Sequence, residues 1–213
     1  MIEFDNILGA IIAGGQATRM NKENKALKML AGRPLAEHIA QRLASQVNQM
    51  IINANRDTAA FSAIGERVMK QPIPIIEDVE ELGAGPLAGL LQSLLHAQKC
   101  NHSHLVTVAG DTPFFPADLA SRIVAAAPNE NTIIIAKSGG FPQPIFGLWP
   151  ATLTDDLHKW LSAGNTNKVM AWVRTHPHQF VEFEAVGQSD PFFNINTPED
   201  LAVAEKIIES EIA

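Results

Sequence analysis

The chain has 213 residues, of which 46% are hydrophobic and 18% charged, and its formal net charge is -7. This composition excludes a disordered chain, and the length allows one large domain or two small ones with a sizeable core. The acidic balance argues against non-specific binding to nucleic acids, which requires a basic surface.

Neither a membrane span nor a disulfide framework is expected. No run of the sequence approaches the roughly 18 to 20 uncharged apolar residues that cross a bilayer. The first residues, MIEFDN, carry acids where a signal peptide carries basic side chains, so we expect a cytoplasmic protein without membrane partners. Cys100 is the only cysteine, which rules out an internal disulfide and a thiolate zinc site and favours an unreactive thiol.

Apolar runs alternate with amphipathic segments in the first half of the chain. Residues 7–13 (ILGAIIA) predict a strand that is buried on both faces, and 49–55 and 74–78 predict two more. A helix is expected from Pro34 to about residue 45, with Leu35, Ile39 and Leu43 along one face. The clearest helix is 85–98, in which leucines 87, 90, 91, 94 and 95 follow the helical period.

The second half continues the alternation. Strands are expected over 104–110, 131–137, 144–150 and 178–184, a helix from about residue 116, and two helices between 151 and 174. In the last helix Thr197 is the predicted N-cap, Pro198 takes the first helical position, and Asp200 stands where a capping box places its acid.

Together these elements predict an α/β fold: a three-layer, Rossmann-like sandwich of a mostly parallel sheet with helices on both faces. Ligands bind such sheets beyond the carboxyl ends of the strands. The loops to inspect are therefore Gly14–Lys25, Asn53–Arg56, Asp78–Gly89, Gly110–Pro113 and Asn194–Pro198.

The first of these loops has an unusual charge. Residues 19–33 hold five basic side chains and one acid, whereas the remaining 11 Lys and Arg face 22 acids. Gly14 and Gly15 would let backbone N–H groups approach an anion, with Arg19 and Lys25 neutralising its phosphates. A solvated turn explains the same residues equally well, and neither G-x-x-x-x-G-K-[ST] nor G-x-G-x-x-G is present.

Two further features have competing interpretations. Asp111 follows an apolar strand and is placed to hold Mg²⁺, although Asp before Thr-Pro also commonly starts a turn. The pairs His102/His104 and His176/His178 have a spacing that suits zinc on a strand, but surface histidines are expected at both places. Trp149, Trp160 and Trp172 are expected to be packing residues.

Several motifs occur in one order along nearly the whole chain: AGG, TRM, Lys25, GRPL, GPLAGLLQSL, GDTPF and NINTPEDL. This pattern resembles the molybdenum cofactor guanylyltransferase (MobA) family among the nucleotidyltransferases. The resemblance implies a nucleotide-diphospho-sugar transferase type of fold and transfer of GMP from Mg-GTP to molybdenum-bound molybdopterin, with release of pyrophosphate. It implies one domain over 1–213, nucleotide-binding to about residue 115 and largely molybdopterin-binding beyond it, and transient contacts with proteins that deliver or accept the cofactor.

The resemblance also implies roles for single residues. Catalysis would rest on Lys25, Arg19 and Asp111, with Asp111 holding Mg²⁺. The nucleotide site would comprise Ile12, Ala13, Gly14, Gly15, Lys25, Asn53, Asp78 and Asp111. The molybdopterin side would comprise Gln143, Lys168, Asn194 and Asn196.

One segment departs from the family. After Arg-Met the usual pattern is Gly-Gly-x-Asp-Lys, but here Asn21, Lys22, Glu23 and Asn24 precede Lys25. Three alternatives therefore stay open: a molybdopterin cytidylyltransferase, a sugar-phosphate nucleotidylyltransferase, and a catalytically silent protein that binds nucleotide or cofactor.

Overall fold

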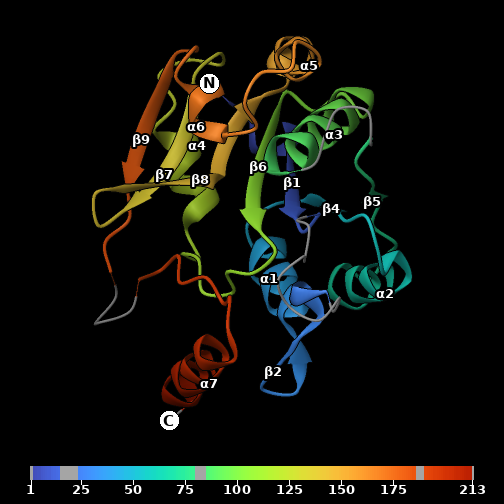
Figure 1. The fold of residues 1–213 in the computed structure, drawn as a ribbon, viewed down its shortest axis with the longest axis vertical. Helices are drawn as coiled ribbons and strands as arrows, with labels where there is room; N and C mark the ends of the chain where they lie inside the picture. Colours follow the sequence, from blue (N-terminus) through green and yellow to red (C-terminus); the bar gives the residue numbers. More distant parts are fainter. Residues whose placement is uncertain (1, 15–23, 80–84, 186–189, 213) are drawn as a thin grey trace.

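A computed structural model describes residues 2–14, 24–79, 85–185 and 190–212, and the remaining residues lie outside the description (Figure 1). Its centre is a seven-stranded sheet with the strand order β5-β4-β1-β6-β8-β7-β9. The strands are β1 (Ile7–Ile12), β4 (Gln49–Asn53), β5 (Ile75–Ile76), β6 (His104–Ala109), β7 (Ile133–Ser138), β8 (Phe141–Pro150) and β9 (His178–Glu182).

The sheet is mostly parallel, as predicted. β5, β4, β1 and β6 pair in parallel, and β7 pairs in parallel with β9. Only β8 runs in the opposite direction, between β6 and β7. The carboxyl ends of β1, β4, β5 and β6 therefore meet at one edge of the sheet, where the predicted site loops begin.

Helices cover both faces of the sheet. The helices α1 (Leu35–Ala44), α2 (Thr58–Met69) and α4 (Leu119–Ala125) pack into one apolar cluster, and α3 (Pro86–Lys99), α5 (Thr154–Ser162) and α6 (Val169–Val173) pack into the other. β1 alternates between the two, since Ile7 and Ile11 face the first cluster and Leu8 and Ala10 face the second. This two-sided burial explains the continuous apolar run in the sequence.

A third, smaller cluster attaches the C-terminal helix α7 (Pro198–Ile212), which lies apart from the sheet near the lower end of the view in Figure 1. Its Leu201, Ala204 and Ile208 pack with Leu30 and Leu35 of the first half of the chain. Leu30 belongs to a short antiparallel hairpin of β2 (Met29–Leu30) and β3 (Arg33–Pro34). The two ends of the chain therefore share a core.

Some local predictions were incomplete or wrong. The sequence reading did not identify α2 or the β2–β3 hairpin, and Pro34 ends β3 immediately before α1. The helix expected from about residue 116 begins at Leu119, and Leu95 is exposed although it follows the helical period. Among the described residues no helix is both long and apolar enough to cross a membrane.

The expectation that the paired histidines lie on the surface was wrong for His102 and His104. Both are buried, and the ring of His104 contacts the Ser103 hydroxyl and the Glu130 carbonyl oxygen. Burial lowers the pKa of each ring, because a charged imidazolium loses its hydration there. The described residues contain no group of three or more His, Cys, Asp or Glu side chains that would hold a metal ion.

The tryptophans pack as predicted. Trp149 and Trp172 are buried and stack on one another with their ring centroids 6.1 Å apart, and Trp160 packs against the same cluster. The indole N–H groups of the two buried rings donate to Thr107 and Asp156. Cys100 is an exposed free cysteine at the end of α3, whose sulfur lies 3.5 Å from the ring of His96.

Candidate active site

Lys25 brings together three segments that are far apart in the sequence. Its Nζ lies 2.7 Å from Oδ2 of Asp111, which follows β6 at the carboxyl edge of the sheet. The same Nζ donates to Oδ1 of Asn194 at 3.0 Å and to Oδ1 of Asn196. One ammonium group is therefore surrounded by three side-chain oxygens, two of them 169 and 171 residues away in the chain.

The backbone holds these side chains in place. The N–H of Ile195 donates to the Asp111 carbonyl oxygen at 2.9 Å, which joins the segment 194–196 to the loop after β6. Ile195 itself is buried in the small cluster under α7. Asp200 then accepts the N–H groups of Asn196 and Thr197 at 2.8 Å, while the Asp200 N–H donates to the Thr197 hydroxyl. The predicted capping box is confirmed, and it fixes the backbone of Asn196, one of the two asparagines that contact Lys25.

The charges of this cluster are partly shielded from water. The side chains of Lys25 and Asp111 are 22% and 25% exposed, so their ion pair is partly buried. Hydrogen bonds from the N–H groups of Asn196 and Thr197 hold the pKa of Asp200 below its ordinary value, and the charge of Lys25 contributes in the same direction. Within the described residues, Lys25 thus interacts with two carboxylates, Asp111 by direct contact and Asp200 through its charge.

A second cluster of side chains lies at the ends of β1, β4 and β5. Nδ2 of Asn53 donates to Oδ1 of Asp78 at 2.8 Å and to the Ile76 carbonyl oxygen at 3.1 Å. Asn55 donates to Oδ2 of Asp78 at 2.7 Å and to the Gly14 carbonyl oxygen at 3.2 Å. The predicted residues Gly14, Asn53 and Asp78 are therefore neighbours, as their positions at one sheet edge suggested.

Asn53 has an unused acceptor. Its side chain is fully buried, and its Oδ1 is the one buried side-chain polar atom among the described residues without a hydrogen-bond partner. That oxygen lies beside two glycines: a Cβ on Gly14 would meet it at 2.8 Å and a Cβ on Gly89 at 2.3 Å. Because unpaired buried acceptors are costly, Oδ1 of Asn53 is a candidate to accept a hydrogen bond from a ligand.

The other predicted nucleotide residues lie between the two clusters or outside the description. Ile12 ends β1, and its carbonyl oxygen accepts the Gly110 N–H at 3.0 Å. The Ala13 N–H donates to the Asn53 carbonyl oxygen at 2.9 Å, which ties the first loop to β4. Gly15 and Arg19 lie outside the described residues, so their predicted roles stay predictions.

The two weaker candidates are not part of the Lys25 cluster. Gln143 is half-buried near the start of β8, at the carboxyl edge of the sheet beyond the residues that pair with β6. Lys168 is exposed at the N-cap of α6, and its backbone N–H donates to the Thr166 hydroxyl. Of the four residues predicted for the molybdopterin side, only Asn194 and Asn196 contact Lys25 in the described structure.

Of the segment that departs from the family, the structure describes only the last residue, Asn24. Asn21, Lys22 and Glu23 lie outside the described residues, whereas Asn24 caps the short helix that begins at Lys25. Oδ1 of Asn24 accepts the Ala26 N–H at 3.2 Å, and its Nδ2 donates to Oδ2 of Asp57 at 3.2 Å. An amide can donate to that carboxylate, which an ionised aspartate cannot do.

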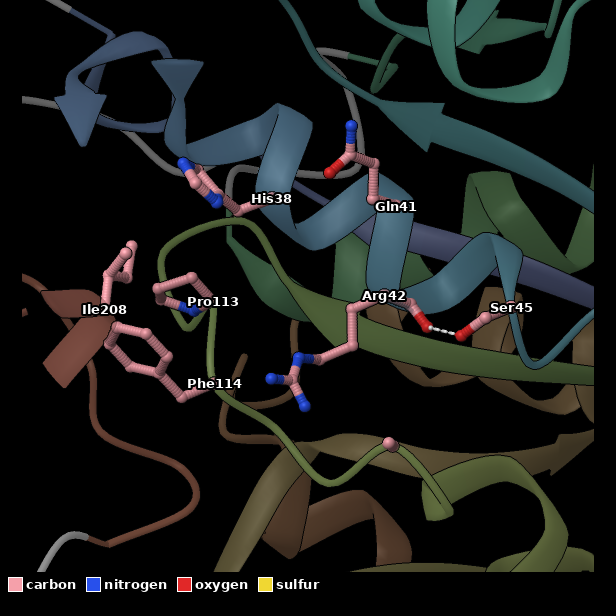
Figure 2. A pocket seen from close by; sticks show the side chains of 8 residues that line it. His38, Gln41, Arg42, Ser45, Pro113, Phe114 and Ile208 are labelled. Atoms are coloured by element: carbon pink, nitrogen blue, oxygen red, sulfur yellow. Dashed lines mark hydrogen bonds between the residues drawn. The ribbon is translucent and has the colours of Figure 1, made fainter. Parts of the chain in front are cut away.

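A pocket of about 400 Å³ lies next to this site, behind the loop that follows Asp111. Figure 2 shows side chains of α1 on one wall, facing Pro113, Phe114 and Ile208 on the other. Its polar groups already have partners in the protein: His38 with Leu30, Gln41 with Arg33, Arg42 with Phe115 and Ser45 with Arg42. In the described part of the chain, no side chain lining this pocket has a buried polar atom without a partner, in contrast to Asn53.

Sequence reasoning missed two contributors. Asn55 and Asp57 were inside or next to a loop marked for inspection, but neither was singled out. Asn55 and Asp57 are polar residues two and four positions past the end of β4, and that position was the available signal. Their partners, Asp78 and Asn24, come from other loops and could not be identified from spacing.

Comparison with known families identifies similar proteins along almost the whole chain. Residues 9–180 match the family model described as the MobA-like NTP transferase domain. A molybdenum cofactor guanylyltransferase from Rhizobium leguminosarum bv. trifolii is 39% identical over 219 residues, and the match covers 99% of both chains.

Solved structures show the same fold. A molybdopterin-guanine dinucleotide biosynthesis protein A from Archaeoglobus fulgidus matches with a TM-score of 0.70 at 22% identity, covering 95% of this chain and 99% of that one. A 4-diphosphocytidyl-2C-methyl-D-erythritol synthase from Anaerococcus prevotii gives 0.74 at 13% identity, covering 97% and 100%. At these identities the likeness establishes the fold alone.

Proposed function

The chain belongs to the MobA-like NTP transferase family, and on that basis we propose that it transfers GMP from GTP to molybdenum-bound molybdopterin. The products are the guanine dinucleotide form of the molybdenum cofactor and pyrophosphate. The relative from Rhizobium leguminosarum bv. trifolii supports this activity, because it is 39% identical and the match covers 99% of both chains.

The reaction exchanges one phosphoanhydride bond for another. An oxygen of the molybdopterin phosphate attacks the α-phosphorus of GTP, and the bond from that phosphorus to the bridging oxygen of the β-phosphate breaks. Pyrophosphate leaves with the bonding electrons. No general base is needed, because a phosphate monoester is already largely ionised near neutral pH. The protein must therefore mainly position the phosphates and offset their charge.

Lys25 is proposed to offset that charge. Its ammonium stands at the carboxyl edge of the sheet with all of its described partners on the substrate-facing loops. Arg19 is proposed to assist from the same loop. Asp111 compensates the Lys25 charge at 2.7 Å, and a triphosphate would be the stronger partner.

Asp111 is proposed to hold Mg²⁺. Its carboxylate fits that ion, because Mg²⁺ binds through one or two carboxylates together with water and phosphate oxygens. Its Oδ2 already faces a cationic group, and its Oδ1 accepts from the Thr112 hydroxyl at 3.2 Å. When bound, the ion would supply positive charge to the phosphates.

The nucleotide is proposed to lie over the ends of β1, β4 and β5, against Ile12, Ala13, Gly14 and Gly15. There the buried Oδ1 of Asn53 is available to accept from an N–H of the base, and the Asp78 carboxylate from a ribose hydroxyl. Asn194 and Asn196 are proposed to face the molybdopterin phosphate, with Gln143 and Lys168 farther out.

One observation carries the proposal: Lys25 contacts Asp111 and the two asparagines at the carboxyl edge of the sheet. The nucleotide loop, the proposed metal carboxylate and the proposed acceptor segment are thus within reach of a single phosphate group. A protein that only bound nucleotide would have no need for the proposed acceptor segment.

The test is to incubate the protein with Mg²⁺, Mo-molybdopterin and each NTP in turn, and to measure pyrophosphate release. Turnover with GTP alone is expected. Turnover with CTP alone would instead identify a cytidylyltransferase, and turnover with a sugar phosphate as acceptor a sugar-phosphate nucleotidylyltransferase. Binding of GTP without release of pyrophosphate would identify a catalytically silent binder.

A further inference from the structure

Three loops of the proposed nucleotide site are joined through one side chain that the family resemblance did not mark, Asn55. We propose that Asn55 is a positioning residue, which holds Asp78 and the Gly14 peptide in the orientation that binds the nucleotide. This inference rests on the proposed function of the site, but it concerns nucleotide affinity and can be tested without turnover.

Asn55 uses both ends of its amide. Nδ2 donates to Oδ2 of Asp78 at 2.7 Å and to the Gly14 carbonyl oxygen at 3.2 Å, and Oδ1 accepts the Asp78 backbone N–H at 2.7 Å. The side chain thus connects the loops after β1, β4 and β5. Hydrogen bonds of an exposed asparagine ordinarily add little to the stability of a protein. Three such bonds to two other loops therefore indicate that the relative positions of these loops matter.

The shortness of β5 explains why a side chain is needed to hold Asp78 in place. This strand has two residues, and its pairing with β4 ends at Asn53 and Ile76. One more ladder bond follows, from the Ala54 N–H to the Ile76 carbonyl oxygen. Beyond this bond Asp78 has no described strand partner. The side chains of Asn53 and Asn55 instead hold it by hydrogen bonds. They point to the same side because they are two residues apart along β4 and its extension.

The effect on Asp78 is to fix both carboxylate oxygens. Oδ1 accepts from Asn53 at 2.8 Å and Oδ2 from Asn55 at 2.7 Å. Each oxygen keeps a further lone pair for another donor, so the carboxylate remains able to accept from a ligand while its orientation is set in advance. Such pre-organisation reduces the ordering that binding must otherwise impose.

Only an amide of this length satisfies the three contacts. Aspartate would keep the acceptor for the Asp78 N–H but lose the donor, and it would place a second negative charge beside the Asp78 carboxylate. Two adjacent carboxylates share a proton, which raises the pKa of the pair. In the variant Asn55→Asp, that proton would restore an O–H donor between residues 55 and 78.

The first experiment compares wild type with Asn55→Ala by isothermal titration with GTP and by steady-state kinetics. The dissociation constant and KM for GTP are expected to rise about 3- to 10-fold, the range for loss of one or two hydrogen bonds. The kcat should change less than the KM, because Lys25 and Asp111 keep their contacts. An unchanged affinity for GTP in Asn55→Ala would overturn the inference.

Asn48→Ala is the matched control. Asn48 stands just before β4, at the opposite end of the strand, and its Nδ2 donates to Oδ1 of Asp5 at 2.7 Å. Its loss removes one exposed asparagine bond of the same kind, and GTP affinity should stay at the wild-type value. An equal loss of affinity in both variants would indicate a general loss of stability and overturn the specific role.

The second experiment measures GTP binding of Asn55→Asp between about pH 8 and about pH 5.5, relative to wild type at each pH. Its affinity is expected to be weakest at the high end and to recover toward wild type as the pH falls, whereas Asn55→Ala shows no recovery. The charged neighbours Arg56, Asp57 and Glu77 are common to all variants and cancel in the ratio. Parallel pH profiles for Asn55→Asp and Asn55→Ala would contradict the proposed bond.

The two proposals fail in different ways. If wild type binds GTP but releases no pyrophosphate, the proposed function is wrong while the titrations still decide the role of Asn55. If wild type turns over GTP and Asn55→Ala matches it in KM, the positioning role is wrong and the function stands.

Discussion

At the scale of single residues, the proposed function predicts that substitutions of Lys25 and Asp111 have the largest effects on activity. They form a partly exposed ion pair, which contributes little to stability because water screens it. Their proposed role is to offset charge on the phosphates of the substrate, where it develops in the transition state. Their substitution should therefore change activity much more than folding.

Lys25→Ala is expected to lower kcat/KM for GTP by about 10²- to 10³-fold, the effect of removing one group that stabilises developing charge. The measurement is pyrophosphate release at saturating Mo-molybdopterin. Lys99→Ala replaces an exposed lysine at the end of α3 and is the control, which should retain most activity. An unchanged kcat/KM in Lys25→Ala would refute the role given to this residue.

Asp111→Ala is expected to abolish turnover with Mg²⁺, because it removes the proposed metal carboxylate. Asp111→Asn separates charge from shape, since it retains one oxygen but not the negative charge, and it should also be severely impaired. Thermal unfolding of each variant checks that the loop after β6 survives. Near-normal activity in either variant would rule out Asp111 as the metal ligand.

At the scale of elements, α7 decides how the acceptor segment meets Lys25. Its capping box orders Asn196 and Thr197, and its apolar face packs on the β2–β3 hairpin that follows Lys25. The sequence allowed this cap to be predicted because Thr197, Pro198 and Asp200 are close in the chain. It did not reveal the hairpin, whose two-residue strands are too short to show a period.

The Asp200 cap should make the stability of this region depend on pH. The lowered pKa in the folded state means that the ionised carboxylate stabilises the fold above its ordinary pKa of 3.8, and that this contribution is lost as the pH falls through the folded value. Asp200→Asn keeps an acceptor without a charge. Its Tm should lie below wild type near neutral pH and converge with wild type below about pH 3.

The comparison requires Tm measurements of both proteins across that range. Glu199→Gln, which removes the neighbouring acid, serves as the control for a general charge effect. A constant difference in Tm between wild type and Asp200→Asn at every pH would contradict a role for the Asp200 charge.

At the scale of the whole molecule, the site exists because four strand ends meet at one edge of the sheet and the C-terminal segment returns to it. The reversed strand β8 lies between β6 and β7, and β9 then follows at the outer edge. This arrangement leaves the edge beyond β5, β4, β1 and β6 to the loops that are proposed to bind the nucleotide. The fold therefore separates the proposed nucleotide site from the histidine-bearing strand beginnings at the opposite edge.

Four buried or half-buried histidines should make the whole fold less stable in mild acid. Burial lowers the folded-state pKa of His38, His96, His102 and His104, so the unfolded chain binds protons more readily. Their contribution is present above the unfolded pKa of about 6.5 and is lost as the pH falls through the lower folded values. The free energy of unfolding should thus fall between about pH 7.5 and about pH 5.5.

Urea denaturation at both pH values measures this change. His104→Gln should reduce the pH dependence, because it removes a buried imidazole with a lowered pKa. His158→Gln replaces an exposed histidine of α5 and provides the matched control. An identical pH dependence in wild type and His104→Gln would contradict the argument from burial.

The sequence by itself determined the order of most strands and helices and the family, and it predicted the edge of the sheet at which ligands bind. Apolar runs and helical periods are local, and motifs such as GPLAG and NINTPEDL are contiguous. These patterns can therefore be recognised in the sequence. The tertiary structure alone decided that Lys25 contacts Asn194 and Asn196 and that Asn55 donates to Asp78. It also decided that His102 and His104 are buried. Those facts depend on which loops the sheet order brings together, and contacts between residues so distant in the chain leave no local pattern to read.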